Sequence, residues 1–418
     1  MNTGGNLLKL LILNGYYSPE ESPDIHLGND YIEAFVENGY EIDLYTPMPT
    51  RRISKELRNR YKKIKYEEKY DGKVKIHRFS MFSEPKNNTL RAFRYALCNI
   101  AHFFKGLLAK DVTVIFACST PPTQGLVASF LKKIKKIPFI YNLQDVFPDS
   151  LCTTGITTKD SLAWKLGRKI EDFTYKNADK IIVISEDFKK NIMTKGVPED
   201  KIEVIYNWVD ENAVIHIDKK DNILFDKLGE CRDKFNVVYA GNLGNAQNID
   251  IIIETANILK DNKNIKFIII GNGPCEEKFK SMAVELENIS FYDLQPYDLV
   301  SYVYSLGDAS FITCPKGMGK NAMPSKTWSI MSAGTAVLAS FDTDSDMNRI
   351  LSENNTGLIA EAEDSKALAE NILYLFNNQD VCCSMGLNAR KYIEAYLTRD
   401  IGTQKYVDLL KKVFDNSL

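Results

Sequence analysis

The strongest constraint on this chain is a repeated alternation of short apolar runs with longer segments of helical period. Such alternation is typical of β-α-β units, in which parallel strands form a sheet that helices cover. In the first half of the sequence it predicts strands at residues 8–13, 41–45, 74–79, 112–117, 139–143, 180–184 and 202–205. The series then starts again, with strands expected at residues 235–239, 265–270, 289–292, 309–312, 336–339 and 357–359. Two such series predict an α/β protein with two Rossmann-like, doubly wound domains.

The length of 418 residues also fits two domains better than one. We expect the division near residue 210, with the polar stretch 210–233 as the linker region. Helices are expected at residues 28–37 and 163–176 in the first half, and at 384–396 and 402–414 near the end.

Composition excludes several classes of protein. The chain is 44% hydrophobic and 26% charged, as in globular proteins, and its net charge of −2 gives no general attraction to nucleic acid. The eight cysteines are scattered without CxxC pairs, which indicates reduced thiols in a cytoplasmic protein. The apolar run at residues 7–13 is interrupted by Lys9 and is too short to span a bilayer, so we interpret it as a buried strand.

Two glycine-rich turns follow strands of the second series. Gly241, Asn242, Gly244 and Gln247 come after the first strand, and the turn 271–274, with Gly271 and Gly273, follows the next. Ligands of open parallel sheets bind at this edge, where exposed backbone N–H groups favour phosphate. The alternative is that these glycines serve only the turns.

A third segment, KGMGKNAMPSK at residues 316–326, leads into an expected helix at 327–333 that Gly334 ends. Pro324 and Ser325 suit a helix start, where serine can cap. With three lysines, the segment predicts a diphosphate site in which Lys326 supplies a point charge. A solvated lysine-rich loop is the alternative.

Longer strings carry a family resemblance. Residues 181–186 read IIVISE, residues 196–210 read GVPEDKIEVIYNWVD, and residues 141–150 read YNLQDVFPDS. With the three loops above, they make the chain similar to the retaining GT-B glycosyltransferases of family 4, especially those that build bacterial capsule and O-antigen chains.

The resemblance implies that residues 211–400 bind a nucleotide-sugar, most often a UDP-sugar, and that residues 1–210 with the final helix 401–418 bind the acceptor, lipid-linked or glycan. The base would lie near residues 271–273 and 294–296, and the ribose and diphosphate near 241–244 and 324–326. The implied donor-site residues are Gly241, Asn242, Gly244, Gln247, Gly271, Gly273, Leu294, Gln295, Lys316, Asn321, Ala322, Met323, Pro324, Ser325, Lys326 and Ser329.

The sequence departs from the family pattern at several of these positions. The paired family glutamates align with Asn321 and Ser329, the usual arginine and lysine of the first loop with Asn242 and Gln247, and a family histidine with Gln144. These departures keep open a non-catalytic nucleotide-sugar-binding scaffold or partner subunit. A nucleotide-sugar epimerase of the same fold is a third reading, which the quoted strings disfavour.

Glycosyl transfer passes through an oxocarbenium-like transition state, so stabilising the departing diphosphate matters more than a nucleophile. The family retains the anomeric configuration, and a front-face route is implied. We expect neither a cofactor nor a metal, because His26, His77, His102 and His216 show no ligand spacing. The catalytic candidates are Asp145, Gln144 and His26. The alternatives are that Asp145 and Asp149 cap a turn and that His26 belongs to a surface loop.

The segment 51–65 carries eight basic residues and one acidic residue. We interpret it as an acceptor or membrane surface, suited to a diphosphate-linked lipid or the inner face of the plasma membrane. Its candidate residues are Arg51, Arg52, Arg58, Arg60, Lys62 and Lys63. Downstream, an apolar stripe at helical spacing is expected to pack on the core. It consists of Leu90, Phe93, Leu97, Ile100, Phe104 and Leu107.

Overall fold

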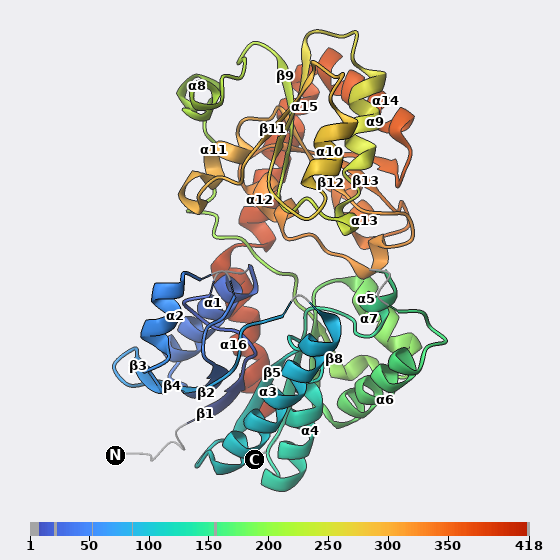
Figure 1. Ribbon diagram of the computed structural model, residues 1–418. Coiled ribbons are helices and arrows are strands. Elements are labelled where there is room, and N and C mark those ends of the chain that lie inside the picture. The colour runs from blue at the N-terminus through green and yellow to red at the C-terminus, as the bar shows by residue number, and fades with distance from the viewer. Residues whose placement is uncertain (1–7, 21–22, 52, 86, 154–156, 416–418) are drawn as a thin grey trace. The chain divides into compact units, whose positions relative to one another are not determined.

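A computed structural model describes residues 8–20, 23–51, 53–85, 87–153 and 157–415. The chain forms two compact units, each built on its own sheet (Figure 1). The first unit is Met1–Tyr206 with Gly402–Leu418, and the second is Asn207–Ile401. The sequence placed these divisions at 210/211 and 400/401, within a few residues.

The first unit contains an eight-stranded sheet in the order β3-β4-β2-β1-β5-β6-β7-β8. Its strands are β1 (Lys9–Leu13), β2 (Glu41–Pro47), β3 (Tyr66–Lys69), β4 (Val74–Phe79), β5 (Val114–Cys118), β6 (Phe139–Leu143), β7 (Lys180–Val183) and β8 (Ile202–Val204). All neighbours are parallel except β3 and β4. The sequence analysis missed β3, whose YEEK sequence lies on a solvent-facing edge and lacks an apolar signal.

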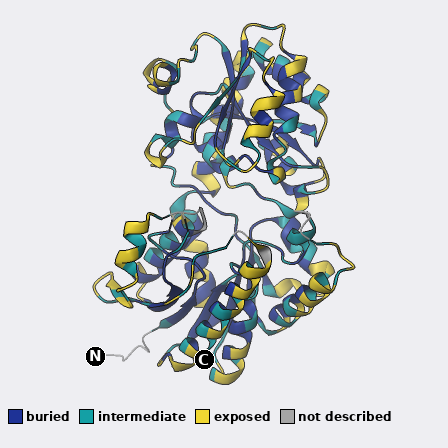
Figure 2. Cartoon of the chain, in the orientation of Figure 1, coloured by how far each residue is buried: buried dark blue, intermediate teal, exposed yellow. Residues whose placement is uncertain are grey.

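The second unit contains a six-stranded, all-parallel sheet in the order β11-β10-β9-β12-β13-β14. Its strands are β9 (Phe235–Ala240), β10 (Ile265–Ile270), β11 (Ile289–Tyr292), β12 (Ala309–Thr313), β13 (Ala336–Phe341) and β14 (Gly357–Glu361). Every residue of β9, β12 and β13 is buried, as expected for central strands of a sheet covered on both faces (Figure 2).

Helices connect the strands of both units. Those of the first are α1 (Pro23–Glu37), α2 (Lys55–Tyr61), α3 (Asn88–Leu108), α4 (Gln124–Lys135), α5 (Asp149–Thr153), α6 (Leu162–Asn177), α7 (Glu186–Thr194) and α16 (Arg399–Asp415). Those of the second are α8 (Leu224–Leu228), α9 (Asp250–Ile258), α10 (Glu276–Met282), α11 (Val300–Tyr304), α12 (Lys326–Ser332), α13 (Asp346–Glu353), α14 (Ser365–Asn377) and α15 (Gln379–Tyr396). Among the described residues, no helix combines the length and the apolar character that a membrane crossing requires.

The polar stretch 210–233 is not a free linker, which corrects the sequence interpretation. It packs along the second unit, where the backbone N–H of Ile217 donates to Ser305 Oγ at 3.0 Å. Asn222 is fully buried and donates to the carbonyl of Tyr302 at 2.8 Å. The polar composition of this stretch suggested that it is exposed to solvent. Instead, its polar groups form hydrogen bonds with residues far away in the sequence, such as Ser305 and Tyr302.

Candidate functional site

Each sheet has a point where the strand order reverses, and the predicted site loops of the second unit lie there. In the second unit, β9 pairs with β10 on one side and with β12 on the other. Loops at the carboxyl ends of such diverging strands leave a crevice that commonly binds ligands. The loop after β9 and the segment after β12 therefore form the edges of a candidate donor site.

The two glycine-rich loops are interlocked through their backbones. The N–H of Gly241 donates to the carbonyl of Ile270 at 2.9 Å, and that of Leu243 donates to the carbonyl of Asn272 at 3.0 Å. A Cβ at Gly271 would lie 1.9 Å from the carbonyl oxygen of Gly241, and one at Gly273 would lie 2.4 Å from that of Leu243. Only glycine permits this approach, so these residues have a packing reason beyond their turns.

Lys326 brings the third segment onto the first loop. Its ammonium lies 3.9 Å from the centroid of the Tyr239 ring, and it would be 2.7 Å from a Cβ at Gly241. Tyr239 is itself fixed, because its hydroxyl donates to the carbonyl of Asn242 at 2.8 Å. Among the described residues no carboxylate pairs with Lys326, and burial lowers its pKa to about 7.

Two acidic residues that the sequence analysis missed hold the third segment in place. Asp342 is buried and accepts from the backbone N–H of Gly317 at 2.8 Å and of Gly319 at 2.7 Å. Glu363 accepts from the backbone N–H of Lys316 at 3.1 Å. Asp342 directly follows the buried strand β13, and this position was the only sequence signal that could have revealed it.

The other two lysines of this segment are paired with acidic side chains. Lys316 lies 3.7 Å from Glu361, and Lys320 forms an ion pair with Asp344. Both lysines are exposed. Of the three lysines expected to share a diphosphate site, only Lys326 reaches the loop after β9.

Several predicted donor residues lie at the same edge of the sheet. Asn242 donates to Gln247 at 3.0 Å, and both side chains lie close to Gly244. Leu294 and Gln295 follow β11, the neighbour of β10, and Leu294 is exposed. Gln295 instead accepts from Lys227 at 3.1 Å.

The remaining donor predictions lie in the loop that leads into α12, and one of them needs correction. Asn321, Ala322, Pro324 and Ser329 are half-buried, and Met323 is buried. Ser325 precedes α12, but its side chain makes no capping hydrogen bond because its backbone is already helical. The predicted serine cap is therefore wrong.

In the first unit, a pocket opens at the carboxyl ends of β1, β5 and β6, again where the strand order reverses. Four tyrosines line it: Tyr16 and Tyr17 after β1, Tyr31 of α1 and Tyr406 of α16. The rings of Tyr31 and Tyr406 stack at 5.5 Å, and the Tyr406 hydroxyl donates to Asn142 at 3.2 Å. The final helix thus supplies part of the pocket wall.

The three catalytic candidates occupy different environments in the first unit. Gln144 lines the pocket, and its side-chain amide donates to Asn142 Oδ1 at 2.8 Å. Its backbone N–H donates to Ser119 Oγ at 2.9 Å. Asp145 is half-buried on the same loop but is not among the residues lining the pocket. His26 lies within helix α1 and is exposed, not in a loop as expected, because α1 begins at Pro23.

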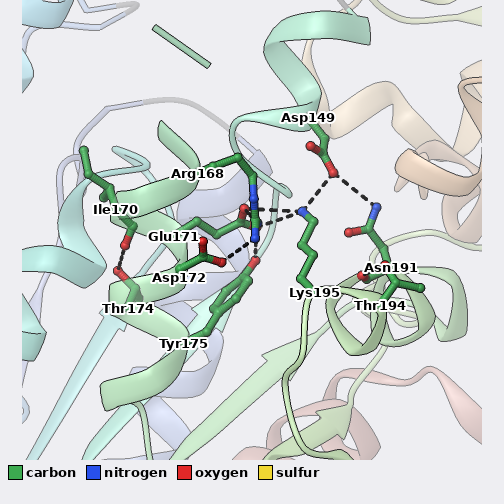
Figure 3. Close-up of polar contacts among 10 residues, drawn as sticks. All are labelled: Asp149, Arg168, Ile170, Glu171, Asp172, Thr174, Tyr175, Asn191, Thr194 and Lys195. Atoms are coloured by element: carbon green, nitrogen blue, oxygen red, sulfur yellow. Dashed lines mark hydrogen bonds and ion pairs between the residues drawn. The ribbon is translucent and has the colours of Figure 1, made fainter. Parts of the chain in front are cut away.

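Asp149 belongs to a charge network that fixes the neighbouring helices (Figure 3). Lys195 lies 2.8 Å from Asp149 and 3.1 Å from Glu171, which also contacts Arg168 and Tyr175. Burial would raise the pKa of Asp149, but the bond and charge of Lys195 outweigh it and hold that pKa below its usual range. Asp149 therefore anchors α5 beside the loop that carries Gln144.

The basic segment forms the short helix α2, which has no buried residue. Arg60, Lys62 and Lys63 are exposed. Arg58 donates to Ser83, and Arg51 lies over the Tyr16 ring at 5.1 Å and 3.6 Å from Glu84. Arg52 lies outside the described residues.

Comparison with known families decides what these two units are. Residues 29–213 match the model of Glycosyltransferase Family 4, and residues 220–392 match that of Glycosyl transferases group 1. The chain belongs to the glycosyltransferases. Together the two matches take in most of the sequence, and they confirm the resemblance expected from residues 141–150 and 181–210.

Relatives of this glycosyltransferase are distant in sequence. It is 24% identical over 348 residues to the probable glycosyltransferase WbjE of Pseudomonas aeruginosa, covering 80% of this chain and 85% of the relative. It is 23% identical over 339 residues to the putative colanic acid biosynthesis glycosyl transferase WcaI of Escherichia coli, covering 78% and 82%. The structure of HepE of Anabaena in complex with UDP and glucose has a TM-score of 0.70 at 13% identity, covering 97% of this chain and 100% of that one. The two Rossmann-like domains expected of a GT-B fold are confirmed.

The glycosyltransferase has no carboxylate at the two positions where the family resemblance implies paired glutamates. Asn321 ends a short 3-10 turn, and Ser329 lies in α12 one turn after Lys326. Over the described ranges, no group of three or more His, Cys, Asp or Glu side chains could hold a metal ion. The residues predicted for the candidate donor site offer backbone groups, amides, serine hydroxyls and the ammonium groups of Lys316 and Lys326.

Proposed function

We propose that this glycosyltransferase moves a sugar from a UDP-sugar to a lipid-linked or glycan acceptor during cell-surface polysaccharide assembly. The observation that carries the donor part is Lys326, a half-buried cation held against the interlocked loops of Gly241 and Gly271. Although the residue is half-buried, its ammonium is desolvated enough to lower the lysine pKa. A desolvated cation without a carboxylate partner is costly unless an anionic ligand compensates its charge. The complex of HepE with UDP and glucose supports uracil as the base.

The proposed chemistry depends on stabilising the leaving group. As the glycosidic bond to the diphosphate breaks, negative charge grows on the terminal phosphate oxygens. Lys326 would neutralise this charge, while the backbone around Gly241 and Gly244 would contact the diphosphate and ribose. The base would lie near residues 271–273 and Leu294. We propose retention of anomeric configuration, with the donor phosphate taking the acceptor proton, and no metal.

The proposed acceptor site is the tyrosine-lined pocket of the first domain. Aromatic rings such as Tyr16 and Tyr406 offer flat apolar faces, and Gln144 and Asn142 offer polar groups suited to sugar hydroxyls. Relatives named for colanic acid and capsular polysaccharide biosynthesis support a polysaccharide intermediate as acceptor.

The donor site is tested by thermal shift and calorimetry with UDP, GDP, CDP and dTDP in the presence of a chelator. UDP at about one hundred times its Kd should stabilise the folded protein by about 2.7 kcal/mol. Lys326→Met keeps the aliphatic stem over Tyr239 but removes the charge, and should weaken UDP binding at least about tenfold. Lys320→Met is the matched control, because Lys320 is exposed and paired with Asp344. Absence of UDP binding by the unaltered protein would reject the proposal.

A second candidate function is a nucleotide-sugar-binding scaffold without turnover, and the observation that favours it is the absence of carboxylates at Asn321 and Ser329. Turnover separates the two functions. The transferase should release UDP from a UDP-sugar when acceptor is present, and the product's anomeric NMR signal should show retention. Tight UDP binding without any release of UDP would support the scaffold.

A further inference from the structure

Helix α3 of the first domain is oriented opposite to the sequence expectation. The apolar stripe that includes Leu97 was expected to face the core, but five of its six side chains are exposed and Leu97 is half-buried. The exposed five are Leu90, Phe93, Ile100, Phe104 and Leu107, with Phe93 and Phe104 exposed by 57% and 59%. Figure 2 shows exposed residues along the outer side of α3. The sequence interpretation of this stripe is therefore wrong.

Two polar residues of α3, Arg94 and His102, are buried and have hydrogen-bond partners. Arg94 is buried and donates to the carbonyl of Phe82 and to Thr50 Oγ1, both at 3.1 Å. His102 is fully buried, with Nε2 3.0 Å from the carbonyl of Tyr45. Because these partners fix the helix in this orientation, the apolar stripe remains in solvent.

The exposed apolar surface continues onto α4. A Cβ at Gly106 of α3 would lie 2.6 Å from the side chain of Leu131, so glycine lets the two helices pack closely. Phe130 and Ile134 of α4 are 45% and 53% exposed. We call the exposed residues Leu90, Phe93, Ile100, Phe104, Leu107, Leu108, Phe130 and Ile134 the α3–α4 face. Exposed apolar surface of this extent marks an interaction site.

Charge indicates what covers the α3–α4 face. Neither α3 nor α4 contains an aspartate or glutamate, whereas Lys105, Lys133 and Lys136 lie on or directly after these helices. The carboxylates near the helix ends include Glu84, which pairs with Arg91, and Asp179, which pairs with Lys132; Asp111 is exposed beyond the end of α3. A second copy of the chain docked through this face would bring lysines against lysines.

The basic helix α2 contacts the segment that leads into α3. Arg58 of α2 contacts Ser83, and Arg51 and Arg91 both lie within 4 Å of Glu84. The basic side chains of α2 therefore add positive charge near the N-terminal end of α3, as Lys105, Lys133 and Lys136 do farther along the α3–α4 face. Apolar side chains bordered by lysine and arginine are typical of surfaces that insert shallowly into anionic lipid headgroups.

We infer that the α3–α4 face docks the first domain on an anionic phospholipid bilayer, with Phe93 and Phe104 inserted and Lys105, Lys133 and Lys136 facing the headgroups. This role is separate from donor binding, which involves the second domain. The aromatic rings supply apolar insertion, and the lysines supply an attraction that salt weakens.

The test is co-sedimentation of the full chain with vesicles of equal parts phosphatidylglycerol and phosphatidylcholine, compared with phosphatidylcholine alone. We expect the protein to sediment with anionic vesicles at low salt, less at high salt, and not with neutral vesicles. Phe93→Ser/Phe104→Ser and Lys133→Glu/Lys136→Glu should each lower the partition coefficient at least about tenfold. Leu387→Ser/Val284→Ser, at exposed apolar positions of the second domain, is the matched control and should bind normally.

Three outcomes would overturn the inference. The protein could stay in the supernatant with anionic vesicles at low salt, or Phe93→Ser/Phe104→Ser could bind like the unaltered protein. Light scattering could instead reveal a dimer that Phe93→Ser/Phe104→Ser dissociates, which would make the face a contact between copies. Hydrogen exchange in the strands of the first domain, compared with the unaltered protein, shows whether that domain is folded in each variant.

Discussion

Lys326 makes donor binding sensitive to pH, because burial lowers its pKa to about 7 in the protein without ligand. A diphosphate favours the protonated lysine, so binding should raise the pKa of Lys326 and take up protons. The affinity for UDP should therefore be highest below about pH 7. Above pH 7 the affinity for UDP should fall by up to about tenfold per pH unit, until the pH exceeds the pKa of Lys326 in the UDP complex.

This pH dependence is measured by calorimetry in buffers of different ionisation enthalpy, which reports the number of protons taken up. Lys326→Met should bind UDP weakly with no proton uptake above pH ~7, where UDP itself is fully ionised. An affinity for UDP that stays constant from about pH 7 to pH 9 in the unaltered protein would contradict the assignment of Lys326 to the diphosphate.

Gly271 offers a second test at the level of single residues. Gly271→Ala would place a Cβ 1.9 Å from the carbonyl oxygen of Gly241, so one of the two loops must move. We expect a loss of about 1–3 kcal/mol in the free energy of unfolding of the second domain and strongly weakened UDP binding, measured by denaturant titration and calorimetry.

Gly28→Ala is the control for this substitution. Its Cβ would make only an ordinary 3.5 Å contact with Tyr31, and the residue lies inside helix α1, where alanine is favoured over glycine. It should leave UDP binding unchanged. Normal UDP binding by Gly271→Ala would show that the interlocked loops do not form the donor site.

Among the elements, α16 joins the end of the chain to the pocket of the first domain. Tyr406→Phe removes the hydrogen bond to Asn142 and should cost about 1 kcal/mol, whereas Tyr406→Ala also removes the stack on Tyr31 and should cost about 3–5 kcal/mol. Hydrogen exchange read by mass spectrometry should show faster exchange in α1 and β5, with the second domain unchanged. Equal exchange in both variants and the unaltered protein would argue against this role of α16.

The sequence predicted strands better than it predicted which side of a helix is buried. Strands β6, β10 and β11 each consist mostly of apolar residues, so they could be located to the residue. Helix α3 was recognised by its apolar period, but that period could not show which side faces the sheet. Arg94 and His102 are buried because their partners, Phe82, Thr50 and Tyr45, come from other parts of the chain.

At the scale of the whole molecule, the two-domain α/β organisation could be predicted because both strand series are visible in the sequence. Part of the candidate site could be predicted for a related reason, since Gly241, Gly271 and Lys326 follow strands whose carboxyl ends share one edge of a sheet. The role of Tyr406 could not be predicted, because its partner Asn142 is brought near only by folding. The position of Asp342 after β13 was a signal, but the backbone N–H groups that it holds are likewise brought near only by folding.

The return of α16 to the first domain also governs the order in which the molecule can fold during synthesis. Residues 207–401 form an uninterrupted domain, whereas the first domain lacks part of its pocket wall until Tyr406 has been made. At about 5–20 residues per second, the ribosome needs ~10–40 s to synthesise the intervening domain. During that interval Tyr31 and Phe116 lack their contacts with Tyr406, so the domain that begins first is completed last.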